Sequence, residues 1–190
     1  MRFEKGHKEV TRKRIIEVAS KRFRKDGVAA SGLAGIMADS GLTNGAFYAH
    51  FDSKEDLVRE SLSSALADQL AQLQQANEAA IDIEGAIRRY LNTSHLEGCE
   101  EGCPSAALLP EISRQPAPTR KAYEEQLLAY AKTLATLLPN PKSAQTKRKA
   151  TAIFSLMVGT LQMARAVSDP LLAEEILEGG VQAALSLAKV

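Results

Sequence analysis

The chain has 190 residues, of which 45% are hydrophobic and 25% charged, and its formal net charge is +1. These proportions are typical of a folded globular protein and exclude collagen-like, mucin-like and wholly disordered chains. No uncharged apolar run reaches the roughly 18 residues that span a bilayer, and the charged N-terminal residues do not resemble a secretory signal. With two cysteines and no signal, we expect a reduced, cytoplasmic protein without a membrane partner.

The charge is concentrated near the N-terminus. Residues 1–25 contain ten Lys or Arg and three Glu, a balance of +7, whereas residues 61–190 have a balance of −2. This asymmetry suggests that the basic segment binds a polyanion, although a solvated helix face explains the same charges equally well.

The first helix is predicted from apolar residues that recur every four positions. Thr11 is expected to cap this helix, and Ile15, Ala19 and Phe23 form its inner face. The helix is expected to end at Asp26-Gly27, where glycine permits a left-handed turn.

Two short helices and the start of a fourth follow. Ser31 is expected to cap the second helix, and Gly41 suits a positive-φ turn after it. Thr43 is expected to cap a third helix that runs to about Phe51, and Ser53 with acidic residues after it opens the fourth.

Longer helices are predicted beyond residue 60, and no strand-like alternation is present. They contain or span Leu62 to Leu73, Ile83 to His95, Ser105 to Ser113, Thr119 to Leu138, Ser143 to Val167, and Leu171 to Ala188. The predicted class is all-α, with about nine helices.

The three short helices within residues 11–51 form the pattern of a helix-turn-helix. A turn with Gly41 joins the last two, and apolar residues of all three predict one shared core. The start of the third helix carries the small or polar residues Thr43, Asn44, Gly45 and Ala46, which permit close approach to a DNA groove.

Residues 11–58 closely resemble the DNA-binding domain of the TetR family of bacterial transcriptional regulators. The resemblance is carried by Thr11-Arg12, Ile15, Ala19, Phe23, Gly27, Ser31-Gly32-Leu33, Ile36-Met37, Gly41-Leu42-Thr43-Asn44-Gly45-Ala46-Phe47-Tyr48-Ala49-His50-Phe51 and Ser53-Lys54-Glu55-Asp56-Leu57. It implies a DNA-binding domain over residues 1–55 and a larger helical domain for effector binding and dimerisation over residues 56–190. It also implies a non-enzymatic regulator, most often a repressor.

The resemblance implies that nine residues contact double-stranded operator DNA. They are Arg12, Ser31, Thr43, Asn44, Gly45, Ala46, Tyr48, His50 and Lys54. Two positions depart from the common family pattern, because Asn44 stands where Lys is frequent and Ala46 where Thr or Ser is frequent. Phosphate contacts are therefore expected to be fewer there, while Asn44 is suited to reading adenine.

Family members are usually homodimers that pair through their last two helices, here Ser143 to Val167 and Leu171 to Ala188. The apolar stripes are Ile153, Leu156, Met157, Thr160, Leu161 and Ala164, with Gly159 allowing close approach, and Ile176, Leu177, Val181, Ala184, Leu185 and Ala188. A core within one subunit explains either stripe nearly as well. Such a dimer would read a near-palindromic operator.

The resemblance also implies a small-molecule effector held by the middle helices. Candidate lining residues, each of which also suits an ordinary core position, are Tyr90, Ser94, His95, Tyr123, Leu127, Tyr130, Phe154 and Met157. The identity of the effector is not encoded in this pattern, and no cofactor is expected.

His95, Cys99 and Cys103 recur every four residues, a spacing that would place them on one face of a continuous helix. Gly98, Gly102 and Pro104 argue against that helix, so a structural role is favoured. Redox sensing by Cys99 and Cys103 and binding of a soft metal are the alternatives. A thiol peroxidase is disfavoured because the cysteines are not spaced C-x-x-C and residues 11–58 would stay unexplained.

Overall fold

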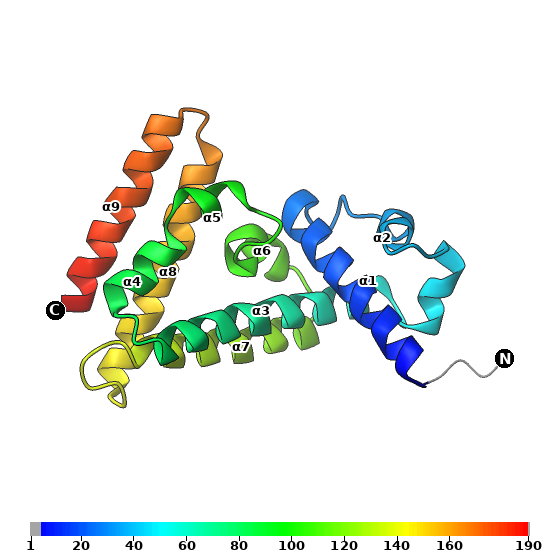
Figure 1. Ribbon diagram of the computed structural model, residues 1–190, viewed down its shortest axis with the longest axis horizontal. Coiled ribbons are helices and arrows are strands. Elements are labelled where there is room, and N and C mark those ends of the chain that lie inside the picture. Colours follow the sequence, from blue (N-terminus) through cyan, green and yellow to red (C-terminus); the bar gives the residue numbers. More distant parts are fainter. Residues whose placement is uncertain (1–4, 190) are drawn as a thin grey trace.

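The computed structural model describes residues 5–189, and Arg2 and Glu4 of the basic segment lie outside this range. All regular elements of the described chain are helical, which confirms the all-α class (Figure 1). No helix among them combines the length and apolarity needed to cross a membrane. The elements are α1 (Lys5–Asp26), α2 (Leu33–Asp39), the 3-10 helix η1 (Asn44–Ala49), α3 (Lys54–Glu78), α4 (Ile83–Tyr90), α5 (Thr93–Glu97), α6 (Pro104–Ile112), α7 (Ala117–Ala135), α8 (Ala144–Ala166) and α9 (Pro170–Lys189).

The N-terminal helices α1, α2 and η1 share one apolar core with the start of α3 and with α6. Ile15, Ala19 and Phe23 lie on the inner face of α1, as predicted. The core is completed by Ile36, Met37, Phe47, Phe51, Leu57, Val58, Leu62, Leu66, Leu108 and Ile112. Two of these residues, Leu108 and Ile112, come from α6, so the rest of the molecule helps to cover the core of the N-terminal helices.

Helix α3 joins this core to a second one. Its first half supplies Leu57 and Leu62 to the N-terminal core, and Leu73 near its end belongs to the core of the helical body formed by α3–α9. Ser53 caps the helix by accepting a hydrogen bond from the Asp56 amide at 3.1 Å, as predicted. Figure 1 shows α3 and α7 running side by side toward the α8–α9 pair.

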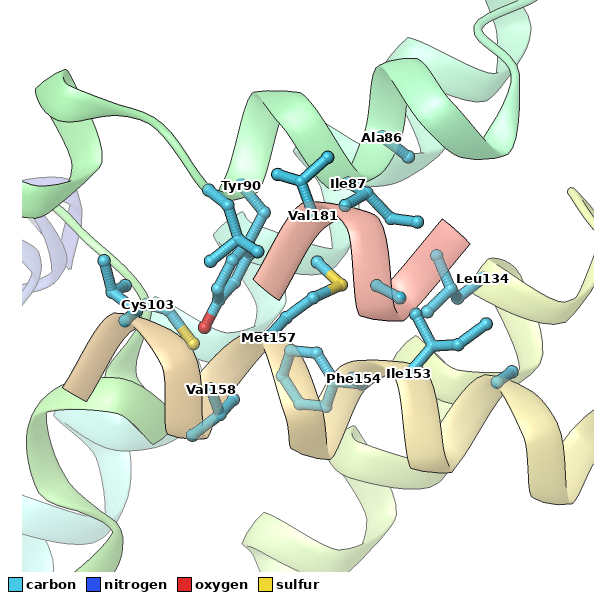
Figure 2. Packing of buried hydrophobic residues seen from close by; sticks show 14 of the residues in the cluster. Ala86, Ile87, Tyr90, Cys103, Leu134, Ile153, Phe154, Met157, Val158 and Val181 are labelled. Atoms are coloured by element: carbon cyan, nitrogen blue, oxygen red, sulfur yellow. The ribbon is translucent and has the colours of Figure 1, made fainter. Parts of the chain in front are cut away.

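Helices α8 and α9 pack closely within one subunit. A Cβ atom added to Gly180 would lie 2.3 Å from the Thr160 methyl group, so only glycine permits this approach. Most of the two predicted stripes, including Met157 and Val181, are buried in the body core (Figure 2). The stripes thus serve the subunit's own core. Gly159 takes no part in this contact within the subunit, because no neighbouring atom lies within 4 Å of a Cβ placed there, and its close approach to a partner subunit stays a prediction.

Two predicted helix starts differ from the structure. Helix α1 begins at Lys5, so Thr11 lies inside it and is not its cap, because residues 5–10 offer no break strong enough to stop the helix. Gly32 takes the cap position of α2, and the Ser31 hydroxyl instead donates to the Gly27 carbonyl at 2.7 Å. Thr43 takes the N-cap position of η1, as predicted, but its side chain forms no cap hydrogen bond, and η1 ends at Ala49, before Phe51.

The helix predicted from Ile83 to His95 is broken in two. Asn92 causes the break because its side chain accepts a hydrogen bond from the His95 amide at 2.8 Å and so caps α5. An asparagine amide that captures the backbone in this way competes with continuation of the preceding helix.

Candidate nucleic-acid interface and effector cavity

The turn between α2 and η1 is fixed by local hydrogen bonds. The Ser40 hydroxyl donates to the Ile36 carbonyl at 2.8 Å, and Gly41 then adopts a φ of +68°, as predicted. The Leu42 amide donates to the Met37 carbonyl at 2.9 Å, which closes the turn. Glycine adopts this left-handed conformation without strain, so the chain can reverse at Gly41. The reversal sets η1 at a steep angle to α2.

Apolar anchors hold η1 in its orientation. Phe47 is fully buried and stacks on Phe51 with ring centroids 5.6 Å apart. Ile36 and Met37 of α2 are also fully buried in the same core. Buried side chains therefore fix the position of η1, and its exposed residues are not needed for packing.

Four of the nine predicted DNA contacts lie exposed at this outer surface, namely Thr43, Asn44, Gly45 and Tyr48. Tyr48 has 72% of its surface exposed, while the edge of its ring rests against Phe47. A tyrosine combines an apolar ring with a polar hydroxyl and is enriched at interfaces, so Tyr48 is a candidate for a contact with a partner. Gly45 has no neighbour within 4 Å of a Cβ position, which leaves open space for a groove wall.

The structure ties three other predicted contacts into the fold. Arg12 pairs with Glu60, donates to the His50 carbonyl and lies 4.7 Å from the Phe51 ring centroid. Ser31 is buried, and the Lys54 ammonium donates to the Val28 carbonyl at 2.8 Å. In the structure these three side chains bond to neighbouring parts of the fold and do not extend into solvent.

The two remaining predicted contacts, Ala46 and His50, are half-buried. Burial and the charges of Lys8 and Arg12 lower the pKa of His50, so its ring is neutral at pH 7. The cations Lys8, Lys13 and Arg14 were not among the predicted contacts, although all three are exposed and none forms an ion pair within residues 5–189. The sequence feature that could have identified these three residues is the basic N-terminal segment itself.

The N-terminal helices match the family model described as bacterial regulatory proteins, tetR family, over residues 15–61. The chain is 39% identical over 93 residues to the transcriptional regulator TtgR of Pseudomonas putida. The N-terminal helices are therefore similar to the DNA-binding part of TetR-family regulators. That aligned stretch covers 48% of this chain and 44% of TtgR, so it spans about half the length of this relative.

Solved structures of TetR-family proteins share the fold of the whole chain. A TetR-family regulator from Cytophaga hutchinsonii matches with a TM-score of 0.77 at 20% identity, covering 97% of this chain and 98% of that one. The reduced form of Escherichia coli NemR matches with a TM-score of 0.76 at 19% identity, covering 93% and 95%. The likeness of fold therefore extends beyond the N-terminal helices to the helical body.

A cavity of about 350 Å³ lies where α1 meets the helical body. Of the eight predicted effector residues, Tyr90, His95 and Tyr130 line it. Phe154 packs behind them, with its ring centroid 4.4 Å from that of Tyr130, and Met157 is fully buried in the core (Figure 2).

The other three predicted effector residues lie outside this cavity. Ser94 is exposed, Leu127 packs against the body core, and the Tyr123 hydroxyl lies 3.2 Å from the Ser105 hydroxyl. The cavity lining that sequence reasoning missed is mainly polar, and comprises Lys21, Arg24, Asp68, Gln69, Gln72, Arg89 and Glu101 together with small apolar residues. Periodicity could not reveal it, because Lys21 and Arg24 reach it from α1, more than 40 residues before the next lining residue, Ala65.

The two cysteines have separate structural contacts. Cys103 is buried at the cap of α6, and its amide donates to His95 Nε2 at 2.9 Å. The Cys99 thiol donates to the Arg24 carbonyl at 3.0 Å, which joins the body to α1. Both cysteines are free thiols, and no three metal-binding side chains cluster within residues 5–189.

His95 holds the segment between α5 and α6 in place. Its Nδ1 lies 2.7 Å from the Tyr90 carbonyl, so Nδ1 carries the proton and Nε2 is free to accept from Cys103. Burial lowers the pKa of His95 despite the bond to Tyr90, which keeps the ring neutral at pH 7.

The segment held by His95 also binds the C-terminal end of α1, in what we term the 99–101 contact. Arg24 Nε donates to the Glu100 carbonyl at 2.7 Å, Lys21 pairs with Glu101 at 2.7 Å, and Lys25 pairs with Glu100 at 3.4 Å. One wall of the cavity is thus also a connection to the DNA-binding helices.

Proposed function

We propose that this chain is a ligand-responsive transcriptional repressor of the TetR family that binds a near-palindromic operator as a homodimer. The observation that carries the proposal is the surface of η1, where Thr43, Asn44, Gly45 and Tyr48 are exposed above a closed apolar core. A surface with those properties suits the major groove, which admits a helix and distinguishes all four base pairs. The proposed domains are residues 1–55 and 56–190, and the proposed compartment is the cytoplasm.

The exposed and the tied residues have different proposed roles. Asn44 and Tyr48 read base edges or reach phosphates, and Gly45 admits the sugar–phosphate backbone. Arg12, Ser31, Ala46, His50 and Lys54 support the interface, and Lys54 turns to a phosphate only by giving up the Val28 carbonyl. Base contacts then set specificity, and exposed cations such as Lys13 and Arg14 supply affinity that falls with salt.

A second copy of the chain is the proposed partner for the outer faces of α8 and α9. The inner faces are used within the subunit, whereas the outer faces carry small or apolar residues that no element covers. They are Ala152, Ser155, Gly159 and Met163 on α8, and Leu172, Gly179, Ala183 and Leu187 on α9. Met163 has 63% of its surface exposed, and open space surrounds both Gly159 and Gly179, so another helix pair can approach closely.

The effector is proposed to act through the cavity at the junction of α1 and the body. Because the 99–101 contact forms part of that junction, a ligand that shifts it changes how the DNA-binding helices sit on the body. The coupling is then a difference in operator affinity between two states of the dimer.

The operator contact is tested with Tyr48→Ala and a matched exposed control, Leu128→Ala, on α7. We expect Tyr48→Ala to weaken operator binding by about tenfold to a hundredfold, the range for losing one good base or phosphate contact. Leu128→Ala should leave it unchanged, and neither variant should change the unfolding temperature by much. Fluorescence anisotropy with the duplex from the chain's own upstream region measures the affinity. Equal affinities for the two variants would place the DNA-binding surface elsewhere.

The dimer face is tested with Gly159→Arg and Gly179→Arg, which add a charged side chain in open space and so spare the subunit fold. We expect both variants to sediment as monomers at micromolar concentration, because a stable interface of about 800 Å² per partner does not accept a central unpaired charge. Leu128→Arg is the control and should stay dimeric. A dimeric Gly159→Arg variant would exclude this face.

A further inference from the structure

Two cations of the cavity lining, Arg24 and Arg89, form no ion pair within residues 5–189. Arg24 is half-buried, its Nε donates to the Glu100 carbonyl, and its Nη1 donates to the Ser20 hydroxyl at 2.7 Å. The carboxylates of Asp68 and Glu101 favour its charged form from a distance, and no acceptor within residues 5–189 bonds to Nη2. Burial lowers the pKa of Arg24, which shows how far its charge is removed from water. A desolvated guanidinium without an anion is costly and marks a place where an anion would be stabilised.

The other charges of the lining do not cancel that of Arg24. Lys21 and Glu101 neutralise each other at 2.7 Å. Arg89 is exposed and forms no ion pair within the described chain, and Asp68 is the single remaining acid of the lining. The lining therefore has two cations against one carboxylate outside the Lys21–Glu101 pair.

The rest of the cavity wall is mainly apolar. Leu73, Ala76, Ala86 and Tyr130 form this apolar part. The Tyr90 side chain is also buried, and its hydroxyl finds no oxygen or nitrogen partner within residues 5–189 and lies beside the Cys103 thiol. Figure 2 shows that hydroxyl directed toward Cys103, which also lines the cavity. Burial raises the pKa of Tyr90 well above its usual value, so the group is a neutral donor.

We infer that this cavity binds a small organic anion, a monocarboxylate with a compact apolar body. The carboxylate lies at Arg24 Nη2 and Arg89, and the apolar body packs against Leu73 and Tyr130. Charge-assisted bonds from arginine to a carboxylate are among the strongest polar contacts in proteins. The volume of about 350 Å³ is at the lower end for ligand sites and fits a ligand of this size.

Binding at Arg24 also gives the ligand a route to the DNA-binding helices, a point that rests on the proposed function. Arg24 and Lys21 belong to α1, which shares one apolar core with α2 and η1. A carboxylate that bonds to Nη2 with one oxygen reaches the neighbouring Nε with the other, and there it competes as the stronger acceptor with the Glu100 carbonyl. The 99–101 contact would then be exchanged for a contact with the ligand.

The inference is tested by isothermal titration of the full-length protein with matched probes at constant pH and ionic strength. The probes are benzoate, its neutral isostere benzamide and the cation benzylamine, with hexanoate, hexanamide and hexylamine as an aliphatic set. We expect at least one carboxylate to bind with a Kd below about 1 mM and at least tenfold more tightly than its amide. The amine should bind most weakly.

Two variants separate charge from fold. Arg24→Gln and Arg89→Gln should each weaken carboxylate binding about tenfold while changing amide binding less than twofold. The Arg89 side chain is exposed and forms no bond to residues 5–189, so its replacement tests the charge even if Arg24→Gln destabilises α1. Arg148→Gln, an exposed change on α8, is the control and should bind as the wild type does.

The inference is overturned if an amide or amine binds as tightly as its carboxylate. It is also overturned if no carboxylate of the panel binds with a Kd below about 1 mM, or if both arginine variants bind as the wild type does. Operator affinity is measured on the same samples without any probe. If the wild-type protein does not bind the operator, the proposed function is contradicted. If it binds the operator but none of the carboxylates, only the ligand class is contradicted.

Discussion

The two ends of α1 carry similar numbers of cations but use them differently. In the N-terminal half, Lys8, Lys13 and Arg14 are exposed and form no ion pair within the described chain. At the C-terminal end, Lys21 and Lys25 pair with Glu101 and Glu100. Partners, rather than the number of charges, therefore decide which part of the basic segment is available to DNA.

The paired end has a structural purpose that net charge could not indicate. Its cations hold the segment between α5 and α6 against the DNA-binding helices, and Arg22 pairs with Asp39 of α2 at 2.6 Å. Surface ion pairs contribute about 0–1 kcal/mol each, so these contacts place the helices more than they stabilise the fold. A contact of modest strength is well suited to being exchanged when a ligand binds.

The largest expected effect comes from neutralising the unpaired end. We expect Lys13→Gln with Arg14→Gln to weaken binding to a nonspecific duplex by about tenfold to a hundredfold near 0.1 M salt. The slope of log affinity against log salt should fall by about 2, because two phosphate contacts are lost. Lys21→Gln with Lys25→Gln is the matched control. If it lowers the slope equally, the two ends of α1 do not differ.

The next largest effect concerns the loop that follows α1. The Glu111 carboxylate of α6 accepts from the Val28 amide at 2.9 Å and from the Ala29 amide at 3.5 Å. Glu111→Ala leaves these donors without their acceptor and should lower the free energy of unfolding by about 1–3 kcal/mol. Hydrogen exchange at residues 27–31 should quicken. Glu125→Ala, an exposed change on α7, should do neither, and unchanged exchange in Glu111→Ala would refute the contact.

A smaller effect is expected from acidification. The pKa of His95 is lowered in the folded state, so below an ordinary histidine pKa of about 6.5 the unfolded chain takes up more protons than the folded one. Stability should therefore fall as the pH drops from 7.5 to 5.5. His95 contributes about 1 kcal/mol of this loss, the value of the Cys103 hydrogen bond that protonation breaks.

His95→Gln should remove that part of the pH dependence and keep the part due to His50, whose pKa is lowered too. His50→Gln is the reciprocal control. Urea unfolding at the two pH values measures both differences, and a His95→Gln variant that loses stability as steeply as the wild type would contradict the assigned role.

The smallest effect is expected for the cysteines. In reducing buffer, Cys99→Ser with Cys103→Ser should keep DNA affinity within about twofold, since serine replaces the Cys99 donor to the Arg24 carbonyl. The redox hypothesis makes a further prediction: peroxide weakens DNA binding of the wild type and spares the double variant. Equal peroxide sensitivity of the two proteins would exclude it.

Much of the fold could be predicted from local patterns. The inner face of α1 was predicted from the spacing of Ile15, Ala19 and Phe23. The turn at Gly41 was predicted because glycine tolerates a positive φ. It was harder to predict which of two neighbouring residues would take a helix-cap position. Ser31 and Gly32 both suit a helix cap, and the hydrogen bond from Ser31 to the Gly27 carbonyl decides between them.

The candidate sites were predicted unevenly for a physical reason. The exposed residues of η1 are contiguous in sequence, so Thr43, Asn44 and Tyr48 could be identified together. The cavity draws Arg24, Gln72 and Tyr130 from three helices, and no periodicity relates residues that far apart. Gly159 and Gly180 lie on different helices, and the sequence alone did not indicate which of them faces the neighbouring helix.

Helix α3 runs without interruption from Lys54 to Glu78 and contributes to both cores. At 1.5 Å per residue its 25 residues form a rod about 37 Å long. A rod of that length amplifies small rotations, because a tilt of about 5° at one end moves the other by about 3 Å, close to the rise of one base pair. The DNA-binding helices thus sit at the far end of a lever, and a change of a few degrees in the body is enough to take them out of register with the groove.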